Sequence, residues 1–236
     1  MHPKRSRLTQ DVTALAAVTL LALVGLAMLA ARPGAQAAPP ATAGQLTISA
    51  SANTVTFGRA TTVSGRLKKG PVQAAVPVTL QENPFPYTGG YRDVGTTATD
   101  AEGRYRFTDV RPELHTRYRA RTAVPDATSA ELLVEVRFKV VLRLDDRTPR
   151  RGQRVTFSGT VAPEHDGRLA YNQRRTSTGN WRTVRRTTLK DAGSEFSRFS
   201  KRIRVRRDTT YRAKVFHDSD HADGTSRRKR ADVVGR

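Results

Sequence analysis

The sequence predicts an all-β protein built from two similar β-sandwiches in tandem. The first observation is a repeat, because Thr116-Arg117-Tyr118-Arg119-Ala120 returns about 93 residues later as Thr209-Thr210-Tyr211-Arg212-Ala213. The second is a succession of short runs rich in Val, Thr and aromatic residues, separated by Gly, Pro and Asp, in both halves of the chain. Cysteine is absent, so buried side chains rather than disulfides must stabilise each sandwich.

The tyrosine of this repeat marks one strand in each half. In immunoglobulin-like sandwiches, a Tyr near the start of strand F turns its hydroxyl back onto upstream backbone, and the residue two positions later faces the core. Tyr118 and Tyr211 match the first position, whereas Ala120 and Ala213 match the second. We therefore expect a strand F at each of these sites.

Turn residues divide the first half into further strands. Their expected ranges are 46–51, 61–67, 76–81, 91–99, 104–107 and 131–136. Asp100 and Gly103 occupy the first and fourth positions that a type I turn favours, which predicts a hairpin between the strands on either side. Strict alternation in the second arm of this hairpin directs Tyr105 and Phe107 inward.

The second half repeats these landmarks. Gly65 corresponds to Gly159, and Tyr91 corresponds to Trp181. No Gly- or Pro-rich break interrupts residues 132–144, so we expect one continuous strand to pass from the first sandwich into the second. The expected domains are residues 46–140 and residues 141–236.

The N-terminal segment is typical of exported proteins. Residues 1–7 are basic, and residues 12–31 form an uncharged apolar run, which predicts an apolar helix. The run is long enough for a membrane anchor, whereas Ala35-Gln36-Ala37 fits a signal-peptidase site with cleavage before Ala38. Residues 1–37 are therefore a signal peptide or a signal anchor, followed by a linker at 38–45. In both cases the rest of the chain is extracytoplasmic, either secreted or anchored to the cytoplasmic membrane.

Positive charge is concentrated in the second half. The whole chain has a net charge of +21, and residues 141–236 contribute +14, with 25 Lys and Arg against 11 Asp and Glu. Such a field attracts polyanions, for example anionic cell-wall polymers. The residues expected to contact one are Lys201, Arg202, Arg204, Arg206, Arg207, Arg227, Arg228, Lys229 and Arg230. Nucleic acid is the weaker candidate, because no recognition motif accompanies the charge.

One short stretch has the residue types of an ion site. Two imidazoles four residues apart bind zinc when a helix aligns them, and alternate aspartates suit calcium. His217, Asp218, Asp220 and His221 are therefore weak metal candidates. Because the stretch falls between two expected strands, we interpret it as a solvated polar loop and expect neither a metal nor a cofactor.

Several structural motifs of the chain carry a family resemblance. They are residues 58–65, Val78-Thr79-Leu80, residues 99–103, residues 181–184 and the two Tyr-Arg-Ala sites. Together they resemble the immunoglobulin-like repeats of bacterial exported and surface proteins, over residues 46–236. The resemblance implies two tandem Greek-key sandwiches. The residues expected to have structural roles are Tyr118, Ala120, Tyr211, Ala213, Trp181, Gly65 and Gly159.

Function is less specified than fold. The chain has no Gly-x-Ser-x-Gly, no His-Glu-x-x-His, no phosphate-binding Gly-rich loop and no cysteine nucleophile, so we expect a protein that is not an enzyme. The resemblance implies an extracytoplasmic spacer, adhesion or recognition module, so we expect a structural or binding module at the cell surface or cell wall. Its expected partner is an anionic wall polymer, which the charge favours, or a surface protein. The alternative hypothesis is a polyanion-binding protein that acts through the basic second domain.

Overall fold

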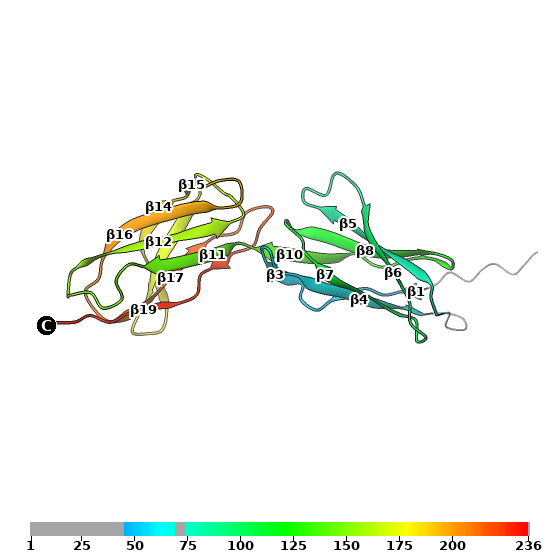
Figure 1. Ribbon diagram of the computed structural model, residues 1–236, viewed down its shortest axis with the longest axis horizontal. Helices are drawn as coiled ribbons and strands as arrows, with labels where there is room; N and C mark the ends of the chain where they lie inside the picture. The colour runs from blue at the N-terminus through cyan, green and yellow to red at the C-terminus, as the bar shows by residue number, and fades with distance from the viewer. Residues whose placement is uncertain (1–44, 69–73, 236) are drawn as a thin grey trace, which may run out of the picture. The chain divides into compact units, whose positions relative to one another are not determined.

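The computed structural model describes residues 45–68 and 74–235, and the regular secondary structure there is entirely β (Figure 1). Within these residues, no helix is long and apolar enough to span a membrane. The apolar helix expected at residues 12–31 and the expected signal-peptidase site lie outside the described residues. For the part of the chain that the structure describes, the all-β prediction is confirmed.

Residues 45–137, which we call the N-terminal sandwich, form two sheets. One sheet contains β1 (Gln45–Leu46), β2 (Ser49–Ala50), β4 (Thr61–Lys68) and β7 (Arg104–Val110), all of which meet at β4. The other has the order β3 (Thr54–Thr56), β10 (Leu132–Arg137), β8 (Thr116–Ala123), β5 (Pro77–Pro84) and β6 (Arg92–Ala98), and β9 (Asp126–Thr128) pairs with β8. Only β3 and β10 run parallel among these pairs of described strands.

Residues 138–235, which we call the C-terminal sandwich, repeat this arrangement. One sheet has the order β11 (Lys139–Leu144), β12 (Arg154–Ala162), β16 (Ser197–Arg204) and β15 (Lys190–Asp191). The other has the order β14 (Trp181–Thr188), β13 (Leu169–Arg175), β17 (Thr209–Val215) and β18 (Gly224–Thr225), with β19 (Lys229–Ala231) also paired to β17. In both sandwiches the strand order is the Greek-key order of immunoglobulin-type folds.

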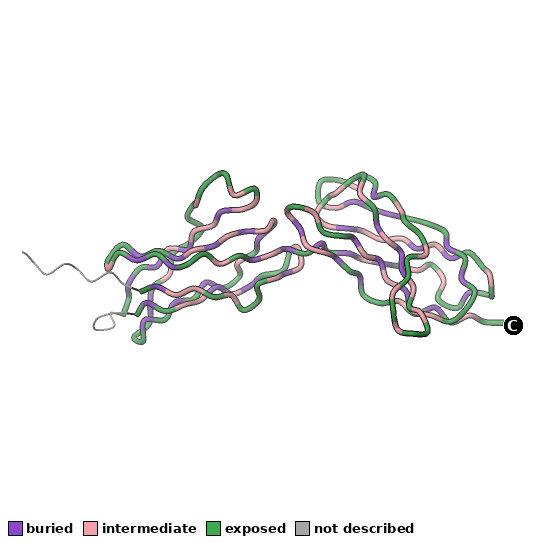
Figure 2. Tube along the Cα trace, turned by 180° about the vertical axis from the view of Figure 1, so that it is seen from behind, coloured by how far each residue is buried: buried purple, intermediate pink, exposed green. Residues whose placement is uncertain are grey.

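Each sandwich has a hydrophobic core between its two sheets. Val63 and Val134 are fully buried in the N-terminal core, and Phe157 and Val205 are fully buried in the C-terminal core. Buried and exposed positions alternate along the strands, as expected when one face of each sheet packs inward (Figure 2). Full burial of such a side chain stabilises the fold by about 1.5–3 kcal/mol.

The close approach of two strands is built in the same way at Gly65 and Gly159. A Cβ atom at Gly65 would overlap the carbonyl oxygen of Thr47, and one at Gly159 would overlap that of Val141. An aromatic side chain from the neighbouring strand fills the other side of each glycine, and at Gly159 this is the ring of Phe199. The glycines therefore let the first strand of each sandwich lie directly against the second.

A buried serine is repeated as well. The hydroxyl of Ser129 accepts the Ala120 N–H at 2.9 Å, and the hydroxyl of Ser226 accepts the Ala213 N–H at 2.9 Å. Each hydroxyl also donates to the carbonyl of the residue that follows it. Each serine thus provides a partner for a buried backbone N–H that the sheet leaves unpaired.

The hairpin predicted around residues 100–103 is wrong. The Asp100–Gly103 hydrogen bond of the expected turn is present at 3.0 Å, but β6 pairs with β5 in one sheet whereas β7 pairs with β4 in the other. The turn therefore joins the two sheets. Tyr105 and Phe107 are buried as predicted, and their side chains fill the space between the sheets.

The continuous strand predicted across residues 132–144 is interrupted. The strand β10 ends at Arg137, and β11 begins at Lys139, so that only Phe138 lies between them. The Phe138 N–H donates to the Ala222 carbonyl at 3.2 Å instead of joining either sheet. Its ring is buried in the C-terminal core.

Candidate functional site

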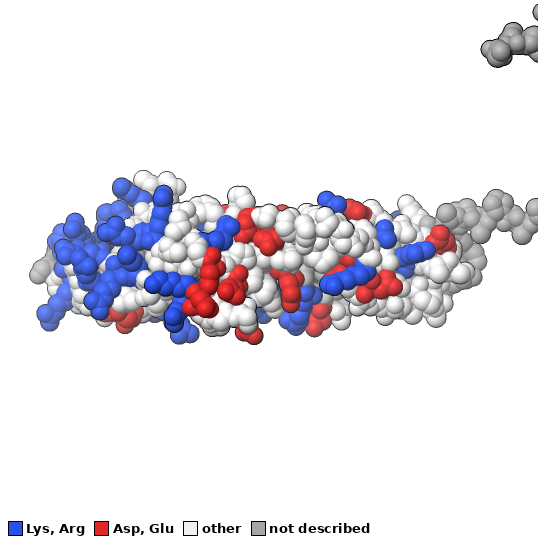
Figure 3. All heavy atoms as spheres, turned by 90° about the horizontal axis from the view of Figure 1, so that it is seen from above, with Lys and Arg blue, Asp and Glu red and all other residues white. Residues whose placement is uncertain are grey.

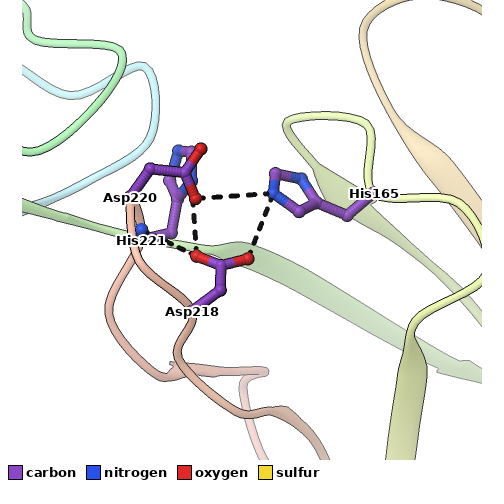
Figure 4. Close-up of side chains that lie close together, drawn as sticks. All are labelled: His165, Asp218, Asp220 and His221. Atoms are coloured by element: carbon purple, nitrogen blue, oxygen red, sulfur yellow. Dashed lines mark hydrogen bonds and ion pairs between the residues drawn. The ribbon is translucent and has the colours of Figure 1, made fainter. Parts of the chain in front are cut away.

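Two loops of the C-terminal sandwich bring imidazole and carboxylate groups together. Asp218, Asp220 and His221 lie between β17 and β18, and His165 lies between β12 and β13 (Figure 4). His165 Nε2 lies 3.3 Å from Asp218 Oδ2 and 3.9 Å from Asp220 Oδ1. His221 Nδ1 lies 3.3 Å from Asp220 Oδ1 and 4.0 Å from Asp218 Oδ1. We call these four residues the His–Asp cluster.

Surrounding groups hold the cluster in place. His221 is 0% exposed, and its ring is stacked on Phe138 with centroids 4.9 Å apart. Its Nε2 lies 2.9 Å from the Glu113 carbonyl oxygen. Asp218 is held on both sides, because Arg168 Nη1 lies 3.0 Å from Oδ2 and the His221 backbone N–H donates to Oδ1 at 2.8 Å. The side chains are therefore oriented before any ligand arrives.

The electrostatics of the cluster favour a charged carboxylate. Burial raises the pKa of Asp220, but the hydrogen bonds to Asp218 and His221, together with the attraction that the His221 and His165 rings exert when they are protonated, outweigh it and leave this pKa below its usual value. Burial lowers the pKa of the nearby His115, although Glu135 partly opposes this effect. The cluster combines carboxylate oxygens with imidazole nitrogens, and both become ligands for divalent cations when the rings are neutral.

The loop of the cluster is hydrogen bonded to the N-terminal sandwich. The Ala222 N–H donates to the Val136 carbonyl at 2.7 Å, and the His115 N–H donates to the Asp220 carbonyl at 3.0 Å. Arg137 and Ala222 also form an isolated parallel β-bridge. The position of the cluster therefore depends on backbone groups from both sandwiches.

Sequence reasoning gave three members of the cluster as weak metal candidates and missed the fourth. Its interpretation of their stretch as a solvated polar loop is wrong at His221, which is fully buried because its ring packs on Phe138. Of its four ion candidates, Asp218, Asp220 and His221 come together, whereas His217 points elsewhere, 75% exposed and 3.2 Å from Asp223 Oδ1. His165 was missed, because it lies far away in the sequence. The expected topology could have indicated His165, because the B–C and F–G loops of an immunoglobulin-like sandwich lie at the same end. His165 is in the first of these loops, and the other three residues are in the second.

A second candidate is a hollow between the edge strand β14 and the part of β16 that β15 leaves unpaired. It has a volume of about 710 Å³ and is lined by Arg154, Thr183, Val184, Arg185, Arg186, Lys201 and Arg202. Five of these residues are cationic and none is acidic. Among the described residues, none of the five forms an ion pair with Asp or Glu. We call this place the basic hollow.

The first run of expected polyanion contacts lies at or near this hollow. Lys and Arg gather over the C-terminal sandwich on the face drawn in Figure 3. Lys201 and Arg202 line the hollow, and Arg204 lies on β16 directly opposite Arg154 of β12. The remaining two, Arg206 and Arg207, are exposed in the connection to β17. Sequence reasoning missed Arg154, Arg185 and Arg186, which other strands contribute.

The second run, Arg227 to Arg230, does not form one patch. Arg227 and Lys229 line a different hollow of about 700 Å³, beside Phe138. Arg228 lies 5.8 Å from the ring centroid of Trp181, and Arg230 Nε lies 2.6 Å from Asp232 Oδ1. Alternate residues of an extended segment point in opposite directions, so adjacent charges in the sequence are separated in space.

The outer face of the β14–β13–β17 sheet carries a cation–aromatic pair. The Arg212 guanidinium lies 4.2 Å from the ring centroid of Trp181, and its Nε donates to Gln173 Oε1 at 2.8 Å. Burial, and then repulsion by Arg228, lowers the pKa of Arg212. The N-terminal sandwich has a corresponding pair. The Arg119 guanidinium lies 3.9 Å from the ring centroid of Tyr91, and Arg119 Nε donates to Gln81 Oε1 at 2.7 Å. Trp181 is partly exposed, so this pair is a surface feature rather than part of the core.

The four residues of the repeated strand F are core residues. Tyr118, Ala120, Tyr211 and Ala213 are each at most 3% exposed. Burial raises the pKa of both tyrosine hydroxyls, and Arg side chains oppose this effect at Tyr211. These residues face the space between the sheets, where a ligand has no access.

Comparisons with known proteins give structural neighbours only. No protein-family model matches the chain, and no curated protein matches it. Among solved structures, it is similar to a tetra-tandem repeat in the extending region of a large adhesion protein, at 16% identity and a TM-score of 0.32, over 80% of this chain and 50% of that chain. It is also similar to the D0-D1 domain of intimin, at 14% identity and a TM-score of 0.31, over 80% of this chain and 98% of that chain.

A third similar structure is the native conformation of E. coli alpha-2-macroglobulin, at 15% identity and a TM-score of 0.31, over 83% of this chain and 14% of that chain. The chain thus spans half of the adhesion-protein chain and a small part of the macroglobulin. The fold described above is defined by the strand order and pairing of this chain itself, and the three structures add no function to it.

Proposed function

We propose that the chain is an exported, non-enzymatic binding module of the cell surface, and that its C-terminal sandwich binds an anionic cell-wall polymer through the basic hollow. The observation that carries this proposal is the set of five cations around the hollow without a carboxylate partner in the described residues. A polymer of repeated phosphate or carboxylate groups neutralises such a set, and the counterions that it releases favour binding.

The arrangement of the strands adds to this argument. Arg154 and Arg204 are directly opposite each other on β12 and β16, and like charges in this position destabilise a sheet. A bound polyanion would remove the repulsion. Edge protection is the competing explanation, because charged side chains on free edges prevent pairing with other chains. It accounts for the cations on β14 and β16 but does not require a hollow between them.

The two sandwiches would serve as a tandem spacer that presents this surface. We propose two domains, each folded around its own core, whose boundary lies at Phe138 rather than after residue 140, because Phe138 and Val140 belong to the C-terminal core. The two separate core clusters support this division. The hydrogen bonds between the loop of the cluster and the N-terminal sandwich support a coupled pair rather than two freely moving domains.

Export is tested by the N-terminus of the mature protein and its cell fraction. If residues 1–37 are a signal peptide, the mature chain begins at Ala38 and is found in the medium or on the wall. If they are an anchor, an intact Met1 terminus is found in the membrane fraction. A cytoplasmic chain with an intact N-terminus would contradict export in either form.

Polymer binding is tested with the full chain on immobilised poly(glycerol phosphate) at increasing salt. The test variant carries Arg185→Ala, Lys201→Ala and Arg202→Ala. The control removes the same residue types from exposed positions of the N-terminal sandwich by Arg59→Ala, Lys68→Ala and Arg106→Ala. Each lost phosphate contact should reduce the slope of log affinity against log salt by about one, so we expect a reduction of about three for the test variant and little change for the control.

Two results would contradict the proposal. If both variants lose binding equally, the polymer responds to net charge and the hollow is not the site. If the wild type is not retained even at low salt, the cations of β14 and β16 act in edge protection. Retention on double-stranded DNA of equal phosphate content measures selectivity, and stronger retention there would favour nucleic acid as the partner.

A further inference from the structure

The tautomer of His221 directs a lone pair into the His–Asp cluster. A carbonyl oxygen only accepts hydrogen bonds, so Nε2, 2.9 Å from the Glu113 carbonyl, must carry a proton. In a neutral imidazole, Nδ1 then has a lone pair. This Nδ1 is buried and has no hydrogen-bond partner, although Asp220 Oδ1 lies 3.3 Å away. A lone pair of a buried ring that faces a carboxylate is unfavourable unless a proton or a metal ion lies between the two.

His165 is oriented in the same way. Its Nδ1 lies 3.3 Å from the carbonyl oxygen of Pro163, which again can only accept. In a neutral ring, Nε2 of His165 therefore has the lone pair, and it faces Asp218 and Asp220. Figure 4 shows the His165 ring pointing at the two carboxylates from the side opposite the loop that carries them. Histidine ligands of metals typically donate their other N–H to a backbone carbonyl, as both rings do here.

The distances fit a small four-coordinate ion. Bond lengths of about 2.0–2.1 Å in tetrahedral geometry place neighbouring ligand atoms about 3.3–3.4 Å apart. The pairs His165 Nε2–Asp218 Oδ2 and His221 Nδ1–Asp220 Oδ1 are both 3.3 Å. The other distances are longer, because Asp220 Oδ1 lies 3.9 Å from His165 Nε2, and Asp218 approaches His221 Nδ1 with its other oxygen, Oδ1, at 4.0 Å. With one ligand atom from each residue, the four atoms lie within 4.8 Å of one another, so a bound ion would have to draw the two loops together.

We propose that the His–Asp cluster is a divalent metal site of the zinc class, with His165 Nε2, His221 Nδ1, Asp220 and Asp218 as ligands. Two imidazole nitrogens favour Zn²⁺ or Co²⁺ over Ca²⁺ and Mg²⁺, which prefer sites made of oxygen alone. The ion would join the two loops that meet at this end of the C-terminal sandwich. Because Glu113 belongs to the N-terminal sandwich, the ion would also stabilise the contact between the two sandwiches. This site does not depend on the basic hollow.

A proton is the competing occupant. A protonated imidazole also neutralises the two carboxylates, and Arg168 already contributes one positive charge 3.0 Å from Asp218 Oδ2. The other groups around His221 are the rings of Phe57, Phe138 and His115, of which only His115 can carry charge. The experiment must therefore distinguish a bound metal from a bound proton.

The test uses the untagged full chain after dialysis against a chelator. Titration with Co²⁺ should give one ion per chain with the intense visible absorption of tetrahedral cobalt, and Zn²⁺ should displace it. In the His165→Asn variant we expect at least a tenfold loss of affinity. The matched control is His217→Asn, which removes the exposed histidine of the same loop outside the cluster and should bind normally.

Nitrogen NMR of the histidine rings makes the result independent of any variant that fails to fold. Zn²⁺ should shift Nδ1 of His221 and Nε2 of His165 in the wild type and leave His217 unchanged. The proposal is overturned if the wild type binds neither Co²⁺ nor Zn²⁺ saturably at neutral pH, which would leave the proton as the occupant. It is also overturned if binding is lost with His217→Asn and kept with His165→Asn.

Discussion

The substitution Gly159→Ala should strongly destabilise the C-terminal sandwich. A Cβ at this position would overlap the Val141 carbonyl oxygen on β11 and lie 2.7 Å from Cζ of Phe199 on β16. Non-bonded carbon and oxygen atoms in sheets approach no closer than about 3.3 Å. Gly159 pairs with Leu142 in the middle of the β11–β12 ladder. The strand β11 must therefore move away from β12 at a point where the ladder pairs before and after Leu142 hold it in place.

The magnitude follows from what this movement breaks. Displacement of β11 removes about two ladder hydrogen bonds, each worth about 0.5–1.5 kcal/mol. Overpacking against the Phe199 ring costs about 1–3 kcal/mol more. The expected loss is therefore about 2–6 kcal/mol. This is a large part of the free energy of unfolding of a typical folded protein, which is about 5–15 kcal/mol.

The assay is urea unfolding followed by circular dichroism and by fluorescence. Trp181 is the only tryptophan of the chain and lies at the start of β14, so its fluorescence reports on the C-terminal sandwich. The control is Gly95→Ala in β6, where a Cβ meets no atom within 4 Å. This change should shift stability by less than about 1 kcal/mol. If Gly159→Ala unfolds at the same urea concentration as wild type, the strands are less closely packed than described and the reasoning fails.

Two further changes test smaller features. Ser226→Ala leaves the Ala213 N–H buried without its partner, and we expect a loss of about 1–3 kcal/mol in the same urea assay, whereas an unchanged midpoint would show that water replaces the hydroxyl. Burial and the hydrogen bond to Glu131 raise the pKa of Tyr91 to about 12, so the protonated hydroxyl stabilises the fold below about pH 10 and this contribution is lost as the pH rises toward 12. Glu131→Gln should lower this pKa, measured from phenolate absorbance after subtraction of Tyr91→Phe, and an unmoved titration would exclude the hydrogen bond as a cause.

The sequence predicted correctly those features of the fold that depend on residues close together in the chain. The inward positions of Tyr105 and Phe107 follow from the two-residue period of a strand, and the repeat of Tyr118 at Tyr211 follows from the shared fold. The sheet that a strand joins does not follow from its sequence. Asp100 and Gly103 form a turn of the same local chemistry whether the chain returns along one sheet or crosses to the other.

The candidate sites were harder to predict from the sequence, because residues from distant segments of the chain form them. Lys201 and Arg202 were visible as a dense basic run, but Arg154 and Arg185 join them only through the pairing and packing of separate strands. The same limit concealed His165, whose partners lie on another loop. Conversely, Arg227 to Arg230 are continuous in the sequence and divided in space, since an extended chain directs neighbouring side chains to opposite sides.

The loop between β17 and β18 has a consequence for any attempt to divide the protein. Its Ala222 N–H and its buried imidazole at His221 obtain their acceptors, the carbonyls of Val136 and Glu113, from the other half of the molecule. Truncation before Phe138 would leave both donors to solvent and uncover a ring that is otherwise shielded. A fragment made of the last hundred or so residues would then carry an altered loop even where its sheets are intact, so measurements on it would not describe this region of the whole chain.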